Sequence, residues 1–276
     1  MLKQRIITAL IFAPLVLGSI YYLDTPAVAV ILGLIILIGA WEWVGLSGFE
    51  NIFVHLAYTI VTALILYLSF PLIGKPSLGV FLVSACFWWL LALISIFIAQ
   101  ARRRLPTQRK ILFLFIGFII LVPAWLAVLY LHNNPKLGPL WVLFLLILIW
   151  TADIGAYFAG RVLGRHKLAD TISPGKSWEG VFGGLVAVLL VSVLLLPYLT
   201  GTGINEIPME MFLLCLGTAV ISVLGDLTES VFKRIAGKKD SGNMLPGHGG
   251  IMDRIDSLTA AAPVFTMGLM LTGFIQ

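Results

Sequence analysis

Charged side chains are scarce in this chain of 276 residues, where Asp, Glu, Lys and Arg make up 11%. Soluble globular domains carry about 25% of such residues. Hydrophobic residues account for 60% of the chain, and the mean hydropathy is +1.04. Because these apolar residues are spread along the whole length, the composition excludes a soluble domain with one membrane anchor. It indicates a polytopic integral membrane protein.

Cysteine is rarer still, with only 2 residues. Cys86 and Cys215 both lie inside apolar runs, where a thiol usually serves as a small hydrophobic side chain. A disulfide framework and a cysteine-based metal site are therefore not expected. The chain also lacks an internal repeat, a low-complexity linker and room for a soluble domain, so residues 1–276 are interpreted as a single membrane domain.

The N-terminus places Lys3 and Arg5 before an apolar run, as a secretory signal peptide does. No small-residue cleavage site follows this run, because Tyr21 and Tyr22 are bulky. The run is therefore interpreted as an uncleaved first membrane span.

Nine apolar runs approach the length of about 20 residues that a membrane-spanning helix needs. The predicted fold is therefore all-α, with about nine transmembrane helices. Five of them form an N-terminal half, 1–131, and four form a C-terminal half, 139–276, in which we expect the catalytic site. The runs cover residues 6–23, 26–46, 54–73, 79–99, 111–131, 139–158, 180–199, 209–232 and 255–275.

The basic residues predict the orientation of these spans. If the N-terminus is cytoplasmic and nine spans alternate, only Lys75 and Lys136 of the 18 Lys and Arg residues lie on the outer side. This bias follows the positive-inside rule and leaves the C-terminus outside. Topology and anionic lipid headgroups thus explain the net charge of +5, and no nucleic acid is expected as a partner. The longest non-apolar stretches, 100–110, 159–179 and 233–254, are all cytoplasmic, so we expect the functional site on that side.

The last of these stretches concentrates charge. Between Asp226 and Asp256 the chain holds four Asp, one Glu, five Lys or Arg and one His. An unpaired carboxylate at the centre of a membrane helix costs about 2.5 kcal/mol or more, so a cation or a water-filled cavity must accommodate these acids. Asp253 and Asp256, three residues apart, share one face at the start of the ninth span. At helical spacing, a second set forms a polar stripe on the eighth span: Ser222, Asp226, Glu229, Ser230 and Lys233.

A glycine-rich loop, 245–250, connects these two spans, and its glycines allow backbone N–H groups to approach an anion. Two helix ends that carry acids can gather oxygen ligands around Mg²⁺, which typically binds one or two carboxylates together with substrate phosphates. Basic residues of the same segment can neutralise phosphate oxygens, namely Lys233, Arg234, Lys239 and Arg254. The alternative is a solvated ion network in which Asp253 and Asp256 only cap a helix. For His248, a phosphate contact and a plain turn residue both stay open.

A second cluster precedes the seventh span. Gly175-Lys176-Ser177 is similar to the end of a P-loop, but Asp170 stands where the first glycine should be and no strand is expected before it. We favour Lys176 as a phosphate contact. The alternative is the start of an interfacial helix, capped by serine, with Trp178 at the level of the lipid headgroups. For Ser177 and Trp178 the two interpretations stay open.

Asp153 is an acid within the apolar sixth span, and Gly155 and Gly160 allow close packing around it. An ionisable residue inside a membrane segment is a functional hypothesis by default, here as support for substrate or metal. An ion pair with Arg161 or Lys176 is the alternative. Glu42, which lies between two tryptophans, is interpreted as a structural residue at the membrane interface.

The last cytoplasmic loop resembles the signature of the phosphatidate cytidylyltransferases, or CDP-diglyceride synthases. That pattern runs from a serine through Lys-Arg, Lys-Asp and His-Gly-Gly to Asp-Arg-x-Asp. The stretches 173–180 and 151–153 also look like this family, whereas before residue 150 the similarity rests on hydropathy and size. The pattern is matched without a departure by Ser230, Lys233, Arg234, Lys239, Asp240, Gly242, Leu245, Pro246, His248, Gly249, Gly250, Asp253, Arg254 and Asp256.

The resemblance implies an enzyme of phospholipid biosynthesis that converts CTP and phosphatidate to CDP-diacylglycerol and pyrophosphate with a divalent metal. Mg²⁺ is the expected cofactor, with room for a second cation. Asp226 and Asp253 are the metal ligands expected first, followed by Asp256 and Asp153. The residues expected to act in catalysis are Asp226, Asp253, Lys233, Arg234, His248 and Arg254. Those expected to bind substrate are Lys176, Ser177, Ser230, Lys239, Gly249 and Gly250.

The same resemblance implies a multi-pass protein of the inner cell membrane whose active site faces the cytoplasm. Its expected partners are CTP, phosphatidate and membrane lipids, and a homodimer is compatible with the family. Two other classes of protein compete with this interpretation. A CDP-alcohol phosphatidyltransferase needs D-x-x-D-G-x-x-A-R, but Ser257-Leu258 follows Asp256. A transporter could use Asp226 and Asp153 as a cation relay, although acids gathered at one face favour chemistry on lipid headgroups.

Overall fold

The computed structural model describes residues 14–75, 77–103, 105–244 and 249–275. Within these ranges residues 14–22 are helical, and eight longer helices follow in order. They are α2 (Thr25–Leu46), α3 (Ile52–Ser69), α4 (Leu78–Arg102), α5 (Lys110–His132), α6 (Gly138–Leu163), α7 (Trp178–Thr200), α8 (Met209–Ile235) and α9 (Met252–Leu271). Two 3₁₀ turns, η1 (Phe70–Leu72) and η2 (Ile204–Glu206), follow α3 and precede α8.

The predicted all-α membrane fold is confirmed. Among the described residues, α2 to α8 are long and apolar enough to cross a membrane, with η1 extending the span of α3. α9 does not belong to this group, because charged residues in its first turns lower its hydropathy. It still begins and ends close to the ninth predicted span. Residues 1–13, which hold the start of the first predicted span, lie outside the described ranges.

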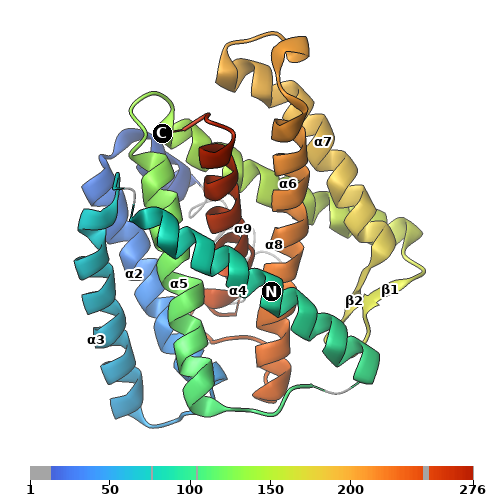
Figure 1. Cartoon of the computed structure of the whole chain (residues 1–276). Helices are drawn as coiled ribbons and strands as arrows, with labels where there is room; N and C mark the ends of the chain where they lie inside the picture. Colours follow the sequence, from blue (N-terminus) through green and yellow to red (C-terminus); the bar gives the residue numbers. More distant parts are fainter. Residues whose placement is uncertain (1–13, 76, 104, 245–248, 276) are drawn as a thin grey trace.

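The helix connections alternate between two ends of the molecule. The α2–α3, α4–α5, α6–α7 and α8–α9 connections lie toward the lower end in Figure 1, whereas the α3–α4, α5–α6 and α7–α8 connections lie toward the upper end with the C-terminus. The connections expected in the cytoplasm therefore share one end.

One short β-hairpin departs from the all-α pattern in the part of the chain that the structure describes. Strand β1 (Lys167–Ala169) pairs antiparallel with β2 (Ser173–Ser177). The segment before the seventh span is thus extended, and α7 begins only at Trp178. The serine cap, one of the two interpretations that the sequence leaves open for Ser177, is present, since Ser177 Oγ accepts a hydrogen bond from Gly180 N at 3.2 Å.

Small residues let α6 and α7 pack closely. A Cβ at Gly155 would come within 2.8 Å of the Ala187 side chain, and one at Gly184 within 2.7 Å of the Ala152 carbonyl oxygen. Spans without large side chains at the contact can approach in this way. The close packing expected around Asp153 is therefore present.

α8 and α9 also cross closely beside the acidic residues. A Cβ at Gly225 would lie 2.5 Å from the Asp256 carbonyl oxygen and 3.0 Å from the Ala260 Cβ atom. Because a backbone atom blocks this space, only glycine fits at this crossing. The crossing brings the turn of α8 that carries Asp226 against the first turns of α9.

Candidate active site

The polar stripe predicted on the eighth span is present on α8. Ser230 Oγ donates to Asp226 Oδ1 at 3.3 Å, and Lys233 Nζ donates to Glu229 Oε2 at 2.6 Å. Both pairs are four residues apart and therefore lie on one helix face. Ser222 and Glu229 are almost completely buried, with 0% and 2% of their surface exposed. The stripe thus faces the protein interior.

Lys233 joins α8 to α9. Its ammonium group also lies 2.6 Å from Asp253 Oδ1, so one cation bridges the carboxylates of Glu229 and Asp253. The other oxygen, Asp253 Oδ2, accepts hydrogen bonds from Ser241 N at 3.0 Å, Gly250 N at 2.8 Å and Ser241 Oγ at 3.0 Å. This carboxylate is therefore held by the bridging lysine and by the loop that precedes α9.

A second lysine lies among the remaining acids. Lys176 Nζ, at the end of β2, forms an ion pair of 2.7 Å with Asp226 Oδ2. Asp153 on α6 and Asp256 on α9 are both close enough to interact electrostatically with Lys176 and Asp226. The structure therefore brings the acids predicted as metal ligands on α6, α8 and α9 toward one another.

The β-hairpin positions Lys176. Lys167 Nζ donates to Pro174 O at 2.7 Å within the hairpin, and Ile172 at its turn is fully buried. Arg234 Nε, on α8, donates to Ile172 O at 3.2 Å. Arg234, predicted to contact phosphate, thus tethers the hairpin to α8 in this structure.

The other predicted residues surround this cluster. Lys239 and Arg254 are exposed near the same helix ends. Gly249 has a φ of +82°, the left-handed region that favours glycine. Gly250 is predicted to bind substrate through its N–H group. In the structure this N–H group donates to the Asp253 carboxylate instead. His248 lies outside the described residues.

The carboxylate oxygens of this cluster are compatible with a hard divalent cation, although those of Asp226 and Asp253 form ion pairs with lysines here. In the described ranges, no three His, Cys, Asp or Glu side chains are arranged as a ready metal site. Asp226 instead pairs with Lys176, and Asp153 and Asp256 lie within electrostatic range of the same ammonium group. Carboxylate oxygens are the protein ligands that Mg²⁺ prefers, so the chemistry of this set suits the ion.

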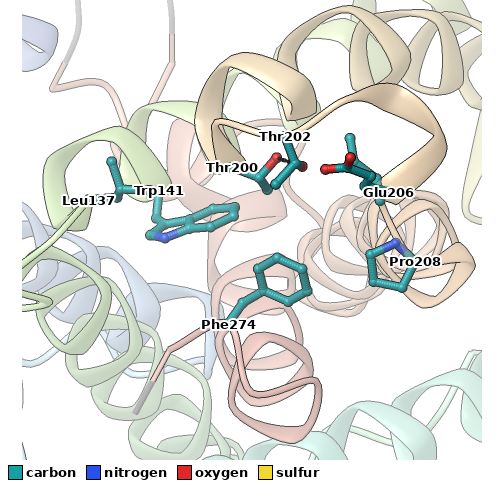
Figure 2. A pocket seen from close by; sticks show the side chains of 8 residues that line it. Leu137, Trp141, Thr200, Thr202, Glu206, Pro208 and Phe274 are labelled. Carbon is teal, nitrogen blue, oxygen red and sulfur yellow. Dashed lines mark hydrogen bonds between the residues drawn. The ribbon is translucent and has the colours of Figure 1, made fainter.

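A cavity of about 240 Å³ lies elsewhere, at the end of the molecule that holds the C-terminus. Figure 2 shows that the rings of Trp141 and Phe274 line it, together with Thr200, Thr202 and Glu206. Thr200 and Thr202 hydrogen-bond to each other at 2.7 Å, and none of the described residues that line the cavity is a lysine or an arginine. Since chemistry on phosphates needs positive charge, the cluster around Lys176 and Lys233 is the better candidate.

Comparison with known proteins supplies the deciding observation. The model of the cytidylyltransferase family matches residues 3–272. The chain belongs to the cytidylyltransferase family. The phosphatidate cytidylyltransferase of Pseudomonas aeruginosa is 42% identical to it, over 99% of both chains. That of Haemophilus influenzae is 36% identical, over 96% of this chain and 98% of its own. The phosphatidate cytidylyltransferase of Staphylococcus epidermidis is 37% identical, over 60% of this chain and 64% of its own.

In this family member, sequence reasoning gave no site role to two residues that contact the cluster. Glu229 was recognised in the stripe, and its spacing of four from Lys233 could have suggested the ion pair. Glu42 was interpreted as structural. The structure shows that it hydrogen-bonds with the loop that holds Asp253, a contact across about 200 residues that no local pattern announces.

Proposed function

We propose that this chain transfers the cytidylyl group of CTP to phosphatidate, giving CDP-diacylglycerol and pyrophosphate. The family match over nearly the whole chain supports the reaction class, and the names of the relatives support the substrates. The observation that carries the proposal is the convergence of Asp153, Asp226, Asp253 and Asp256 with two lysines at one end of the helices.

The chemistry asks little of a general base. An oxygen of the lipid phosphate, already anionic near neutral pH, attacks the α-phosphorus of CTP. The bond from that phosphorus to the oxygen bridging to the β-phosphate breaks, and pyrophosphate leaves with the electron pair. The difficulty lies in bringing two polyanions together, which requires alignment and charge neutralisation.

We propose that Asp226 and Asp253 hold Mg²⁺, supported by Asp256 and Asp153. Mg²⁺, when bound, would neutralise phosphate charge and align the two substrates. A second cation at the same acidic set is part of this proposal. Asp226 pairs with Lys176 and Asp253 with Lys233, so a cation that took over these two carboxylates would release both ammonium groups to turn toward phosphate oxygens.

The remaining assignments follow the same logic. We propose that Lys239 and Arg254, exposed near the helix ends that carry the cluster, attract the triphosphate. Arg234 is proposed to act by holding the hairpin that carries Lys176, and His248 by contacting a phosphate. Ser177, Ser230, Gly249 and Gly250 are proposed to shape the substrate site around them.

The location is proposed from charge. The helix ends that carry the cluster also carry most of the basic residues, which favours the cytoplasmic side of the inner membrane. The large apolar surfaces of α3, α4 and α7 are proposed to contact lipid, and a homodimer is compatible with this arrangement.

The reaction is tested by turnover of purified protein with phosphatidate. We expect incorporation of radiolabelled CTP into lipid in the presence of Mg²⁺, and loss of this activity when EDTA removes the metal and its return when Mg²⁺ is restored. UTP serves as the nucleotide control, and dCTP tests the role of the ribose hydroxyl. Turnover that is unaffected by EDTA would contradict the metal assignment, and ion flux in proteoliposomes without any CTP incorporation would favour a transporter.

Replacing Lys176 with methionine tests the phosphate contact. We expect KM for CTP or for phosphatidate to rise about tenfold or more, because one charge-assisted hydrogen bond is worth about 1.5–3 kcal/mol. Steady-state kinetics with each substrate varied in turn will show which one is affected. Lys136→Met, on the exposed α5–α6 connection at the other end, is the matched control. Unchanged kinetic constants in Lys176→Met would remove this lysine from the site.

A further inference from the structure

Glu42 lies near the end of α2, and only 5% of its surface is exposed. Its Oε1 atom accepts a hydrogen bond from Ile251 N at 3.1 Å. Its Oε2 atom accepts hydrogen bonds from Met252 N at 2.8 Å and from Ser241 Oγ at 2.9 Å. All three donors belong to the segment 241–252, which leads into α9.

These contacts supply hydrogen-bond acceptors for the first N–H groups of α9. The first N–H groups of any α-helix lack partners within the helix. The residue at the N-cap of α9, Ile251, has no side chain that can accept a hydrogen bond, and Glu42 accepts the N–H groups of Ile251 and Met252 from a different helix. A negative charge at this position is also favoured by the helix dipole.

The same contacts lead to Asp253. Ser241 Oγ lies 2.9 Å from Glu42 Oε2 and 3.0 Å from Asp253 Oδ2, so one hydroxyl group links the two carboxylates. Ser241 N and Gly250 N, on the two sides of the loop, donate to the same Asp253 oxygen. The orientation of the Asp253 carboxylate therefore depends on a loop that Glu42 anchors.

The glycines of the loop are adapted to this anchor. A Cβ atom at Gly242 or at Gly250 would run into the Glu42 carboxylate. The backbone can close around the buried side chain only because both positions lack a side chain. The contact between α2 and the segment before α9 thus requires a buried acid on one side and two glycines on the other.

We propose that Glu42 is a positioning residue, which fixes the described parts of the segment before α9, 241–244 and 249–252, and, through them, the carboxylate of Asp253. The proposal rests on the proposed function, in which Asp253 acts at the reacting phosphates. It assigns a part of the active site to the N-terminal half of the chain. Partners of this kind, which orient a functional carboxylate without touching substrate, typically change activity about 10- to 100-fold when they are removed.

The test compares Glu42→Ala and Glu42→Gln with Glu50→Gln, an exposed acid in the adjacent α2–α3 connection. We expect Glu42→Ala to lower kcat about 10- to 100-fold with KM for CTP close to wild type. Glu42→Gln should retain part of the activity, because it keeps the shape and one acceptor oxygen. Glu50→Gln should match wild type.

Hydrogen exchange of the protein without substrate or metal separates positioning from general stability. In Glu42→Ala we expect faster exchange in peptides covering 241–256, with α5 and α6 unchanged. Ser241→Ala should reproduce a part of the kcat loss, and its effect should add less than fully to that of Glu42→Gln, since both weaken the same support of the Asp253 carboxylate. This pair keeps the test decisive if Glu42→Ala does not fold.

Wild-type kcat in Glu42→Gln and Ser241→Ala would overturn the proposal, and so would faster exchange spread over the whole chain. Asp253→Asn is assayed beside these variants. If it stays active, the assignment of the site fails; if it is inactive while the Glu42 variants are not, only the positioning role fails.

Discussion

Replacing Asp253 with asparagine is expected to lower the rate of CDP-lipid formation by about 10²–10³-fold, the scale seen when one preorganised electrostatic contact at a reacting centre is lost. The carboxylate has the Lys233 ammonium on one oxygen and N–H and O–H donors of Ser241 and Gly250 on the other. An asparagine amide must turn its NH₂ group toward one of these donor sets, and it offers a metal only a neutral oxygen. The rate is measured with purified protein and radiolabelled CTP.

Membrane insertion should be unaffected, because the substitution keeps the shape of the side chain and leaves the apolar helices unchanged. Asp226→Asn should also lower the rate of CDP-lipid formation without affecting membrane insertion, since it removes the ion pair with Lys176. Asp170→Asn, at an exposed acid of the β-hairpin, is the control. Near-normal turnover by both Asp226→Asn and Asp253→Asn would refute their assignment as metal ligands.

Lys233→Met is expected to give the largest loss of stability. Lys233 is 11% exposed and bridges two carboxylates, Glu229 and Asp253, whose side chains are 2% and 8% exposed. Removing one partner of a buried ion pair costs about 3–5 kcal/mol, because the opposite charge is left without compensation. The midpoint of thermal unfolding in detergent should therefore fall clearly below that of wild type, and activity should be lost.

A second substitution separates the two effects. Adding Glu229→Gln to Lys233→Met removes one of the uncompensated charges, so the midpoint should recover in part while the activity stays low. Lys136→Met again serves as the control for loss of a positive charge. An unchanged midpoint in Lys233→Met would show that this lysine does not compensate the buried acids.

Features that depend on neighbours in sequence could be predicted. Apolar runs of about 20 residues gave the helices to within a few residues, because hydrocarbon thickness sets their length. The spacing of Asp226, Ser230 and Lys233 placed them on one face of α8 because the helical repeat does so in any helix. The cap of α7 by Ser177 follows the same local logic.

Features that depend on tertiary contacts could not be predicted from the sequence. In the sequence Arg234 is one more cation beside Lys233. In the structure its guanidinium group donates a hydrogen bond to the carbonyl oxygen of Ile172, 62 residues away. The hairpin before α7 is too short to show a strand pattern. Glu42 stands between tryptophans that are typical of a membrane interface, and only the folded chain shows which backbone groups it accepts.

The hydrogen bonds between α2 and the start of α9 have a consequence for biogenesis. Residue 42 is synthesised and enters the membrane early, whereas its three donors lie close to the end of the chain. The Glu42 carboxylate therefore lacks these partners until the chain has been synthesised through residue 252. If Glu42 positions Asp253 as proposed, catalytic competence is a late event of assembly, and a nascent chain that stops before α9 is expected to be inactive even though most of its spans are in place.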